Sequence, residues 1–423
     1  MKKFFKYLLS LGLLLSVQAK ADLANVSGGF NLTETDEFHY DASVDGTKTP
    51  AQVAVDHIKR LGGKHVELNV RARMITGTGT EIVPVTKPAD RADEAKRMIR
   101  LMKYIKEQGM TVGIRPIFFV VGPNGEFPYY QIMPDGHRKH WWHGNIQPVD
   151  PDRWFDSFRT YLDVYITIAN IGKADEFTIG AELYSMTVGI EDQWQEYQYG
   201  FPGRWLALLR YVKMKLPRAM LMYDINFTDD SNTSGGFQKS GGELERWRYR
   251  LVDLANPTDP EELKIWQDLV QFWRELDGIG IDMYRSLASR GQVPPTNYND
   301  LVKLLRQRAD SYASQLDTAW TEISLVTEVE KKLYFKEIGY RSVQNGFIDP
   351  FTFADNDPRV NIMHQAAAYD AFFGAFWDAK WPWLGGVFFW DVSVDPSKHT
   401  GKDSGFSPMN KKQTEEVILK RFK

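Results

Sequence analysis

The chain has 423 residues and no cysteine, and its 52 basic and 55 acidic side chains give a formal net charge of −3. The lack of cysteine excludes disulfides, thiolate metal sites and lipoprotein attachment. The sequence has no basic patch or arginine-rich tail, which argues against a nucleic-acid partner. Aromatic residues make up 13% of the chain, and many of the 13 tryptophans stand beside turns and charged residues rather than within apolar stripes.

The first 21 residues have the pattern of a secretory signal peptide. Three lysines precede an apolar run over Tyr7–Val17, and Ala19-Lys20-Ala21 is a small-x-small cleavage site. The run is too short to anchor the protein in a bilayer. We therefore expect residues 22–423 to be exported to the periplasm or beyond the cell, with no membrane association after cleavage. Cleavage removes four lysines and no acid, which changes the net charge to −7.

Beyond this segment, short apolar stretches bounded by Gly, Pro or Asp alternate with amphipathic stretches. The apolar stretches are typical of buried parallel strands, and the amphipathic ones of helices. The predicted strands are Val26–Leu32, His65–Val70, Thr111–Val121, Glu176–Glu182, Ala219–Phe227, Gly278–Tyr284, Lys332–Ile338 and Gly385–Asp391. The predicted helices are Thr49–Leu61, Ala92–Gln108, Pro151–Asn170, Gly203–Leu216, Pro260–Leu276, Tyr298–Thr318, Val360–Ala379 and Gln413–Phe422.

Eight strands alternating with helices predict a single (β/α)8 TIM barrel over residues 22–423. The chain is longer than the usual ~250 residues, and the excess lies in segments that follow predicted strands. We therefore expect enlarged βα loops at the barrel end where active sites form. The polar, Gly-rich stretch Ser231–Gly242 is expected to be a surface loop. The long segments are Thr76–Asp90, Gly122–Val149, Leu183–Pro202 and Thr228–Asp259.

Two predicted strands each deliver one glutamate at the point where the strand should end. These are Glu182 in IGAEL and Glu337 in FKEIGY. A buried strand normally excludes carboxylates, because desolvating an unpaired charge is costly. Since all barrel strands end at the same mouth, the two glutamates can meet there. Paired carboxylates are the working groups of most glycoside hydrolases. The alternative is two unrelated glutamates in salt bridges at strand ends.

Glutamates after the fourth and seventh strands resemble the pattern of clan A glycoside hydrolases. The finer pattern is similar to glycoside hydrolase family 113, whose characterised members are retaining β-mannanases. By this resemblance Glu182 is the acid/base and Glu337 the nucleophile. The supporting segments, in family order over nearly the whole mature chain, are WHGNIQP (142–148), FTIGAEL (177–183), DGIGIDMY (277–284), FKEIGY (335–340), GGVFFWD (385–391) and DSGFSPMNK (403–411).

Further site residues follow partly from the resemblance and partly from their place in strands. Tyr284 resembles the clan tyrosine that orients the nucleophile, and Trp390 resembles the platform under the sugar at the cleavage point. Either could instead be an ordinary strand-end or core aromatic. Arg115 lies in an otherwise apolar strand, so it contacts the sugar or the nucleophile, or forms a structural ion pair. Asn226 and Asn31 are predicted sugar contacts.

Three histidines, His137, His140 and His143, follow one another at intervals of three. Zinc sites favour histidines backed by carboxylates on a rigid element, whereas this segment has the composition of a loop. We therefore expect no metal. Trp142 and His143 form a sugar subsite above the cleft, or else part of a structural loop. The sequence also lacks a phosphate-cradling Gly loop and a dinucleotide fingerprint, so we expect no cofactor.

The two catalytic roles place different demands on the carboxyl groups. An acid must hold its proton near neutral pH, so we expect the surroundings of Glu182 to raise its pKa. Glu337 must stay ionised, and a hydroxyl donor such as Tyr284 would favour that form. Ala181 departs from the family pattern, because many clan A enzymes have an asparagine there that binds the sugar 2-hydroxyl. Another residue must supply this contact, or the substrate differs.

These observations predict a monomeric, metal-free, retaining glycosidase that acts by double displacement on a β-1,4-linked polysaccharide. The resemblance implies mannan as the substrate. Two alternatives stay open. The first is a barrel that binds glycan without cleaving it. The second is a transglycosylase that uses the same two carboxylates with a sugar as acceptor.

Overall fold

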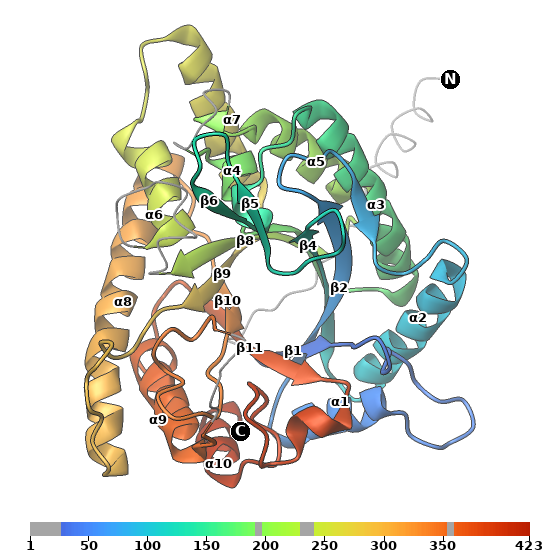
Figure 1. Ribbon diagram of the computed structural model, residues 1–423, viewed down its shortest axis with the longest axis vertical. Coiled ribbons are helices and arrows are strands. Elements are labelled where there is room, and N and C mark those ends of the chain that lie inside the picture. The colour runs from blue at the N-terminus through green and yellow to red at the C-terminus, as the bar shows by residue number, and fades with distance from the viewer. Residues whose placement is uncertain (1–26, 191–196, 229–240, 353–358) are drawn as a thin grey trace, which may run out of the picture.

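The computed structural model describes residues 27–190, 197–228, 241–352 and 359–423. Eight parallel strands form a closed ring, because β1 pairs with both β11 and β2. Helices surround the ring (Figure 1), so the predicted (β/α)8 barrel is confirmed. The strands of the ring are β1 (Ser27–Thr33), β2 (His65–Ile75), β4 (Thr111–Val121), β7 (Glu176–Ala181), β8 (Met220–Thr228), β9 (Gly278–Tyr284), β10 (Leu333–Ile338) and β11 (Leu384–Ser393).

The predicted signal peptide and most of the predicted surface loop Ser231–Gly242 lie outside the described residues. None of the helices in the described ranges combines the length and the apolar character needed to cross a membrane.

Each predicted helix is present. They are α1 (Pro50–Arg60), α2 (Arg91–Glu107), α3 (Pro151–Gly172), α5 (Pro202–Lys215), α7 (Pro260–Glu275), α8 (Tyr298–Thr327), α9 (Ile362–Phe372) and α10 (Lys412–Phe422). Helix α8 continues past the predicted end at Thr318, because Ala319, Ile323 and Thr327 keep the buried face at intervals of four residues. Two short helices, α4 (Tyr184–Thr187) and α6 (Gly242–Arg248), follow β7 and β8.

Side-chain caps fix where several of the outer helices begin. Asp150, Asp259, Asn297 and Asn361 each accept a hydrogen bond from a backbone N–H in the first turn of the helix that follows. Thr49 does the same for α1 and forms a reciprocal capping box with Gln52. Such caps satisfy donors that a helix end otherwise leaves unpaired, and each stabilises the protein by about 1 kcal/mol.

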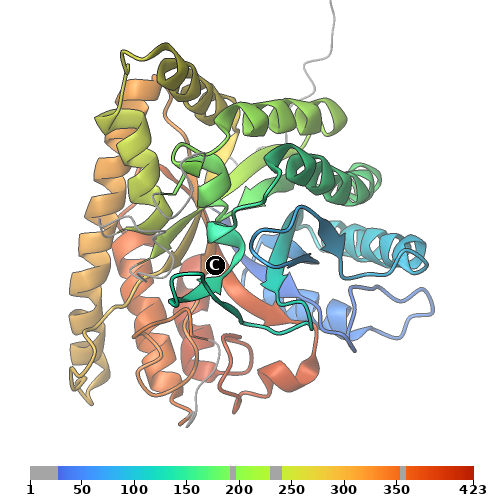
Figure 2. The same ribbon diagram turned by 45° about the horizontal axis from the view of Figure 1, so that its top comes forward.

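The enlarged βα loops contain strands that the sequence pattern did not predict. β3 (Ile82–Pro84) pairs antiparallel with β2, while β5 (Tyr129–Ile132) and β6 (Arg138–Trp141) form a hairpin. The prediction of a loop over 138–141 is therefore wrong. Lys139 and Trp141 are buried and their neighbours are not, but four residues of alternation are too few to identify a strand from sequence. The hairpin lies across the barrel in both views (Figures 1 and 2).

Candidate active site

Glu182 follows the last residue of β7 in an unusual backbone conformation. Its φ of 55° lies in the left-handed region, which is uncommon for a residue other than glycine. Two hydrogen bonds hold the turn: the N–H of Glu182 donates to the carbonyl of Asp224 (2.8 Å), and the N–H of Leu183 donates to the hydroxyl of Tyr223 (3.0 Å). Such strain is typical of residues whose side chains must be aimed at a site.

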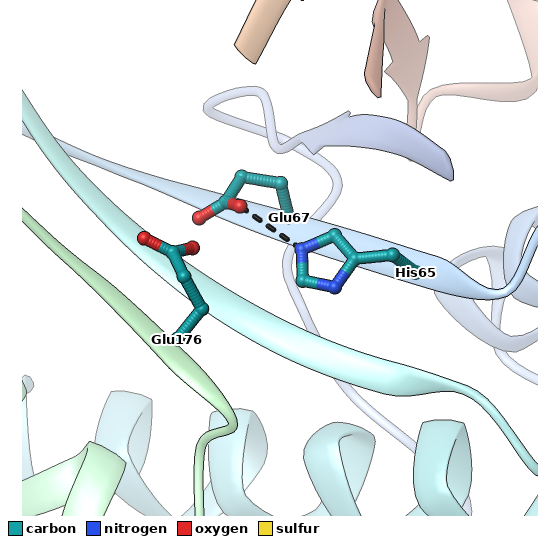
Figure 3. A group of neighbouring side chains, drawn as sticks. All are labelled: His65, Glu67 and Glu176. Carbon is teal, nitrogen blue, oxygen red and sulfur yellow. Dashed lines mark hydrogen bonds and ion pairs between the residues drawn. The ribbon is translucent and has the colours of Figure 1, made fainter. Parts of the chain in front are cut away.

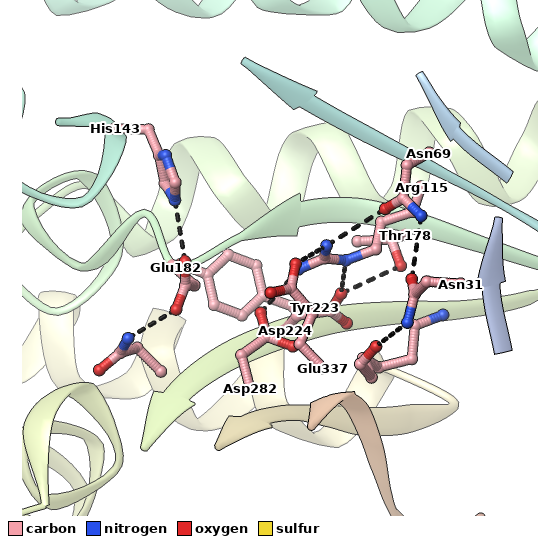
Figure 4. Close-up of polar contacts among 12 residues, drawn as sticks. Asn31, Asn69, Arg115, His143, Thr178, Glu182, Tyr223, Asp224, Asp282 and Glu337 are labelled. Carbon is pink, nitrogen blue, oxygen red and sulfur yellow. Dashed lines mark hydrogen bonds and ion pairs between the residues drawn. The ribbon is translucent and has the colours of Figure 1, made fainter. Parts of the chain in front are cut away.

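The Glu182 carboxyl group has one partner on each oxygen (Figure 4). Nε2 of His143 lies 3.0 Å from Oε2, and Nδ2 of Asn226 donates to Oε1 at 2.5 Å. Burial acts to raise the pKa of Glu182, since only 12% of the side chain is exposed. The hydrogen bond and the electrostatic interaction with His143, followed by the hydrogen bond from Asn226 and the charge of Arg115, outweigh burial and bring the pKa of Glu182 below its ordinary value.

Glu337, near the end of β10, is held by two different donors. The guanidinium of Arg115 bonds its Oε1, and the hydroxyl of Tyr284 donates to its Oε2 at 2.7 Å. Burial raises the pKa of Glu337, Arg115 opposes that rise, and the negative charge of Glu182 adds to it. Glu182 is therefore close enough to Glu337 for its charge to act on it, and both residues lie at the carboxyl ends of parallel strands of the ring.

The predicted order of the two pKa values is wrong for this site. The surroundings were expected to raise the pKa of Glu182 and to keep Glu337 ionised, whereas the pKa of Glu182 is lowered and that of Glu337 is raised. The physical reason is the contact with His143. This residue comes from the segment after β6, about forty positions before Glu182, and its approach depends on how the hairpin folds.

Arg115 both contacts the predicted nucleophile and forms structural ion pairs, the two alternatives that the sequence left open. It is 1% exposed, contacts Glu337, and also pairs with Asp224 (2.6 Å) and Asp282 (2.7 Å). Its Nη1 further donates to Oδ1 of Asn69 at 3.3 Å. Arg115 therefore acts on the site through Glu337 and not through an exposed surface. Asp224 was missed, although an aspartate inside a buried strand is a signal for such a pair.

Asn31 does not fit its predicted role, and the prediction that it contacts a sugar is wrong. The side chain is 0% exposed. Its amide donates to the carbonyls of Lys336 (2.6 Å) and Phe388 (3.2 Å) and accepts from Asn69 (3.0 Å). Asn31 lies level with Glu67 on the neighbouring strand, which is deeper in the barrel than Asn69 and Arg115. All of its polar atoms are used within the barrel wall.

The structure places the other predicted sugar contacts at or beside the glutamates. Asn226 is 4% exposed and bonds Glu182, so it acts on that carboxyl group. Trp390 is half-buried near the end of β11, the strand next to that of Glu337. The ring of Trp142 packs edge-on against His143, with centroids 4.7 Å apart, and it is tilted against the ring of Tyr184, with centroids 5.8 Å apart.

The three regularly spaced histidines have three separate environments. His137 bonds Asp135 on the exposed turn of the hairpin, His140 stacks on Tyr130 with centroids 4.8 Å apart, and His143 contacts Glu182. They do not converge on a common point. Their spacing therefore does not form a metal site.

Deeper in the barrel, His65, Glu67 and Glu176 lie close enough together to hold a metal ion (Figure 3). However, Nζ of Lys336 already bonds Oε2 of Glu67 (2.5 Å) and of Glu176 (2.6 Å). Gly280 leaves room for this lysine, since a Cβ there would come within 2.7 Å of Lys336 Cγ. All four side chains are 0% exposed, so the group is a buried ion network with its own cation.

Burial sets the protonation state of this network. It raises the pKa of Glu176 to about 8, and it lowers the pKa of His65 to about 3. His65 is therefore neutral at physiological pH. Its ring stacks on Phe388 with centroids 4.2 Å apart, which suits a neutral imidazole packed in the core.

We predict that Lys336→Met lowers the free energy of unfolding by about 3–5 kcal/mol, because it leaves two buried carboxyl groups without their cation. Urea denaturation followed by circular dichroism measures the change. Lys332→Met is the matched control on the same segment, since Lys332 is exposed and bonds the carbonyl of Pro382. A loss no greater than that of the control would contradict the prediction.

A further buried carboxyl group, Glu243 in α6, was missed by the sequence analysis. It is 1% exposed, and three donors surround it. Burial raises the pKa of Glu243 to about 8. The only sequence signal is GGELERW, in which one glutamate of a charged helix faces inward, and nothing in the pattern says which one.

The raised pKa of Glu243 predicts a pH dependence of stability. Between about pH 4.5 and pH 8 the folded protein binds a proton that the unfolded chain releases, so the free energy of unfolding falls as pH rises. Glu243→Gln removes this contribution. The difference in unfolding free energy between about pH 5 and pH 8, measured by urea denaturation, should shrink by roughly 3 kcal/mol. An unchanged difference would show that Glu243 is ionised throughout this range.

The family model of Glycoside Hydrolase Family 113 matches residues 258–411. The resemblance to family 113 is confirmed. Over these residues the chain is similar to a family of glycoside hydrolases. The matched range contains Tyr284, Glu337 and Trp390, whereas Glu182 and His143 lie outside it, so their place in the site rests on the geometry. No curated protein matches the chain.

Solved structures of two β-mannanases have the same fold. The GH113 β-mannanase AaManA from Alicyclobacillus acidocaldarius, solved with ManMIm, is 15% identical with a TM-score of 0.61, and the match covers 95% of this chain and 98% of that one. Another GH113 β-1,4-mannanase is 18% identical with a TM-score of 0.58, covering 94% and 99%. At this identity the likeness shows the fold, and it extends over nearly the whole of both chains.

Proposed function

We propose that this protein is an exported, retaining glycoside hydrolase that cleaves a β-1,4-linked polysaccharide of the mannan type by double displacement. The observation that carries the assignment of roles is the difference between the partners of the two glutamates. Glu337 is held by Arg115, which is always charged, and Glu182 by His143, which can change its hydrogen-bonding role.

A nucleophile must stay ionised and keep one orientation. Arg115 and Tyr284 both donate to Glu337, and neither can accept a proton from it at neutral pH. They therefore favour the carboxylate and direct it at the anomeric carbon. Attack by Glu337 forms a glycosyl-enzyme bond while the glycosidic bond to the leaving oxygen breaks.

An acid/base must pass through both protonation states in each turnover. Because its contacts lower its pKa, Glu182 must first take up a proton. It gives this proton to the leaving oxygen, and it then takes one from the water that releases the sugar from Glu337. Nε2 of a neutral imidazole donates or accepts according to its tautomer. His143 can therefore donate to Glu182 when that group is ionised and accept from it when it is protonated. Arg115 can only donate, and so could not serve both states.

The substrate part of the proposal rests on the relatives, since both solved structures named above are β-mannanases. A panel of mannan, glucomannan, xylan, cellulose, chitosan and peptidoglycan tests it. We expect new reducing ends from mannan, with the β-anomer released first in a proton NMR time course. Release of the α-anomer first would contradict retention, and cleavage of another polymer alone would replace mannan as the substrate.

Export is a separate part of the proposal, supported by the pattern of the first 21 residues. Amino-terminal sequencing of the protein purified from a secreting host should begin at Asp22. Retention of the first lysines on the purified protein would overturn export by signal cleavage. Product analysis at high oligosaccharide concentration separates hydrolysis from transglycosylation, since only the latter yields products longer than the substrate.

A further inference from the structure

Glu243 lies directly behind the acid/base, and the chemistry proposed above makes no use of it. Its Oε2 accepts a hydrogen bond from the backbone N–H of Asn226 (3.2 Å). Its Oε1 accepts from the hydroxyl of Tyr223 (3.0 Å) and from Nε1 of Trp247 (3.1 Å). A buried carboxyl group with three donors has one well-defined position, because moving it would leave buried N–H and O–H groups unpaired.

Two of these three contacts lead to Glu182. Tyr223 also accepts the N–H of Leu183, so it holds the peptide unit that follows Glu182 in its left-handed conformation. Asn226 in turn donates from Nδ2 to Oε1 of Glu182. The first arm of contacts, through Tyr223, therefore fixes the backbone of the acid/base. The second arm, through Asn226, fixes its carboxyl group. Both arms start at Glu243.

The local chain is built to bring Glu243 this close. Gly242, the residue before it, has a φ of +60°, and a Cβ at this position would lie 2.6 Å from Oδ1 of Asn226. Any other residue would push α6 away from β8. The glycine therefore allows the first turn of α6 to pack directly against the strand that carries Asn226.

We propose that Glu243 is a positioning residue for the proton donor, which it holds in place through Tyr223 and Asn226. The proposal rests on the proposed function, because it takes Glu182 to be the group that protonates the leaving oxygen. It goes beyond that function by assigning a role to a side chain that touches neither substrate nor the reacting atoms.

The role predicts a specific kinetic signature. A misplaced proton donor slows the release of a poor leaving group, but it hardly affects a leaving group that departs as a stable anion. The probes are phenyl β-mannobioside and 2,4-dinitrophenyl β-mannobioside. For Glu243→Gln and Tyr223→Phe, we expect kcat/KM on the phenyl substrate to fall by about 10- to 100-fold, and to change little on the dinitrophenyl substrate. Both oxygens of Glu243 can accept a hydrogen bond even when the group is protonated, whereas the NH2 group introduced by Glu243→Gln accepts none, so either Tyr223 or the N–H of Asn226 loses its acceptor.

Trp247→Phe is the control, since it removes a donor to Glu243 and packing volume but leaves both arms intact. It should change kcat/KM on both substrates by the same factor. A parallel loss on both substrates in Glu243→Gln would overturn the proposal and leave Glu243 a structural residue.

A crystal structure of Glu243→Gln tests the same idea without substrate. We expect Glu182 to have moved away from Nδ2 of Asn226, or Leu183 away from Tyr223. If both contacts persist, the positioning role is wrong. Should the wild type cleave neither mannobioside, the proposed substrate fails, and the crystal structure still decides on Glu243.

Discussion

Replacing Glu337 with alanine should abolish hydrolysis, with kcat falling by a factor on the order of 10⁵ to 10⁶, the range seen when a catalytic nucleophile is removed. In the proposed mechanism this side chain supplies the atom that attacks the anomeric carbon, and neither Arg115 nor Tyr284 can replace it. Added azide should then restore turnover of 2,4-dinitrophenyl β-mannobioside, because the small anion fits the space left by the carboxylate. Azide attacks from the face that Glu337 occupied, so the product should be the α-mannosyl azide.

The anomeric configuration of this product shows from which face azide attacked, and NMR of the purified mannosyl azide determines it. Glu330→Ala is the matched control, because Glu330 is an exposed glutamate seven positions earlier on the same segment. It should keep wild-type activity and show no azide effect. Recovery of the β-azide from Glu337→Ala would mean that an enzyme-bound intermediate still forms without this residue. The nucleophile would then have to be another group.

The barrel and the place of both glutamates could be predicted because they depend on local patterns. A strand buried on both faces needs an apolar run of a fixed length, and Gly278–Tyr284 has the same bounds in prediction and structure. A carboxyl group where such a run ends is conspicuous in the sequence, as Glu182 and Glu337 are. Arg115 was recognised for the same reason, since a charge within an apolar strand requires a partner.

How deep each inward-pointing side chain lies along the barrel axis could not be predicted from such local patterns. Alternation indicates that Asn31 points inward, but the stagger between strands decides how deep it lies. The pairing of β1 with β2 sets Asn31 beside Glu67, one layer below Arg115. Lys336 has the same inward orientation and also lies in this lower layer. Sequence spacing along one strand contains no information about its offset from the next.

The contacts made by the inserted segments could not be predicted from the sequence either. His143 reaches Glu182 only because β5 and β6 fold into a hairpin, and Glu243 reaches Asn226 only because α6 packs on β8. Both depend on tertiary packing of segments with weak local preferences. The contact with His143 lowers the pKa of Glu182, which explains why the pKa shift of this residue was predicted with the wrong sign.

Replacing Glu182 with alanine should give a different loss from that of Glu337→Ala, and the comparison decides between the two roles. On phenyl β-mannobioside, kcat/KM should fall by about 10²- to 10⁴-fold, since the leaving oxygen no longer receives a proton. On the dinitrophenyl substrate, the first bond cleavage should stay near the wild-type rate. A burst of dinitrophenolate should be followed by slow turnover, because no base activates water against the intermediate on Glu337.

Azide should speed up the slow breakdown of the intermediate on Glu337, since an anion needs no base. It should attack from the side where water normally attacks. The product is then the β-mannosyl azide, opposite to that of Glu337→Ala. This pair of results also bears on the pKa order of the site, in which Glu182 is the group with the lowered pKa. If the two azide products were exchanged between the variants, Glu182 would be the nucleophile. His143 would then act, as Arg115 does in the present assignment, to keep a carboxylate ionised.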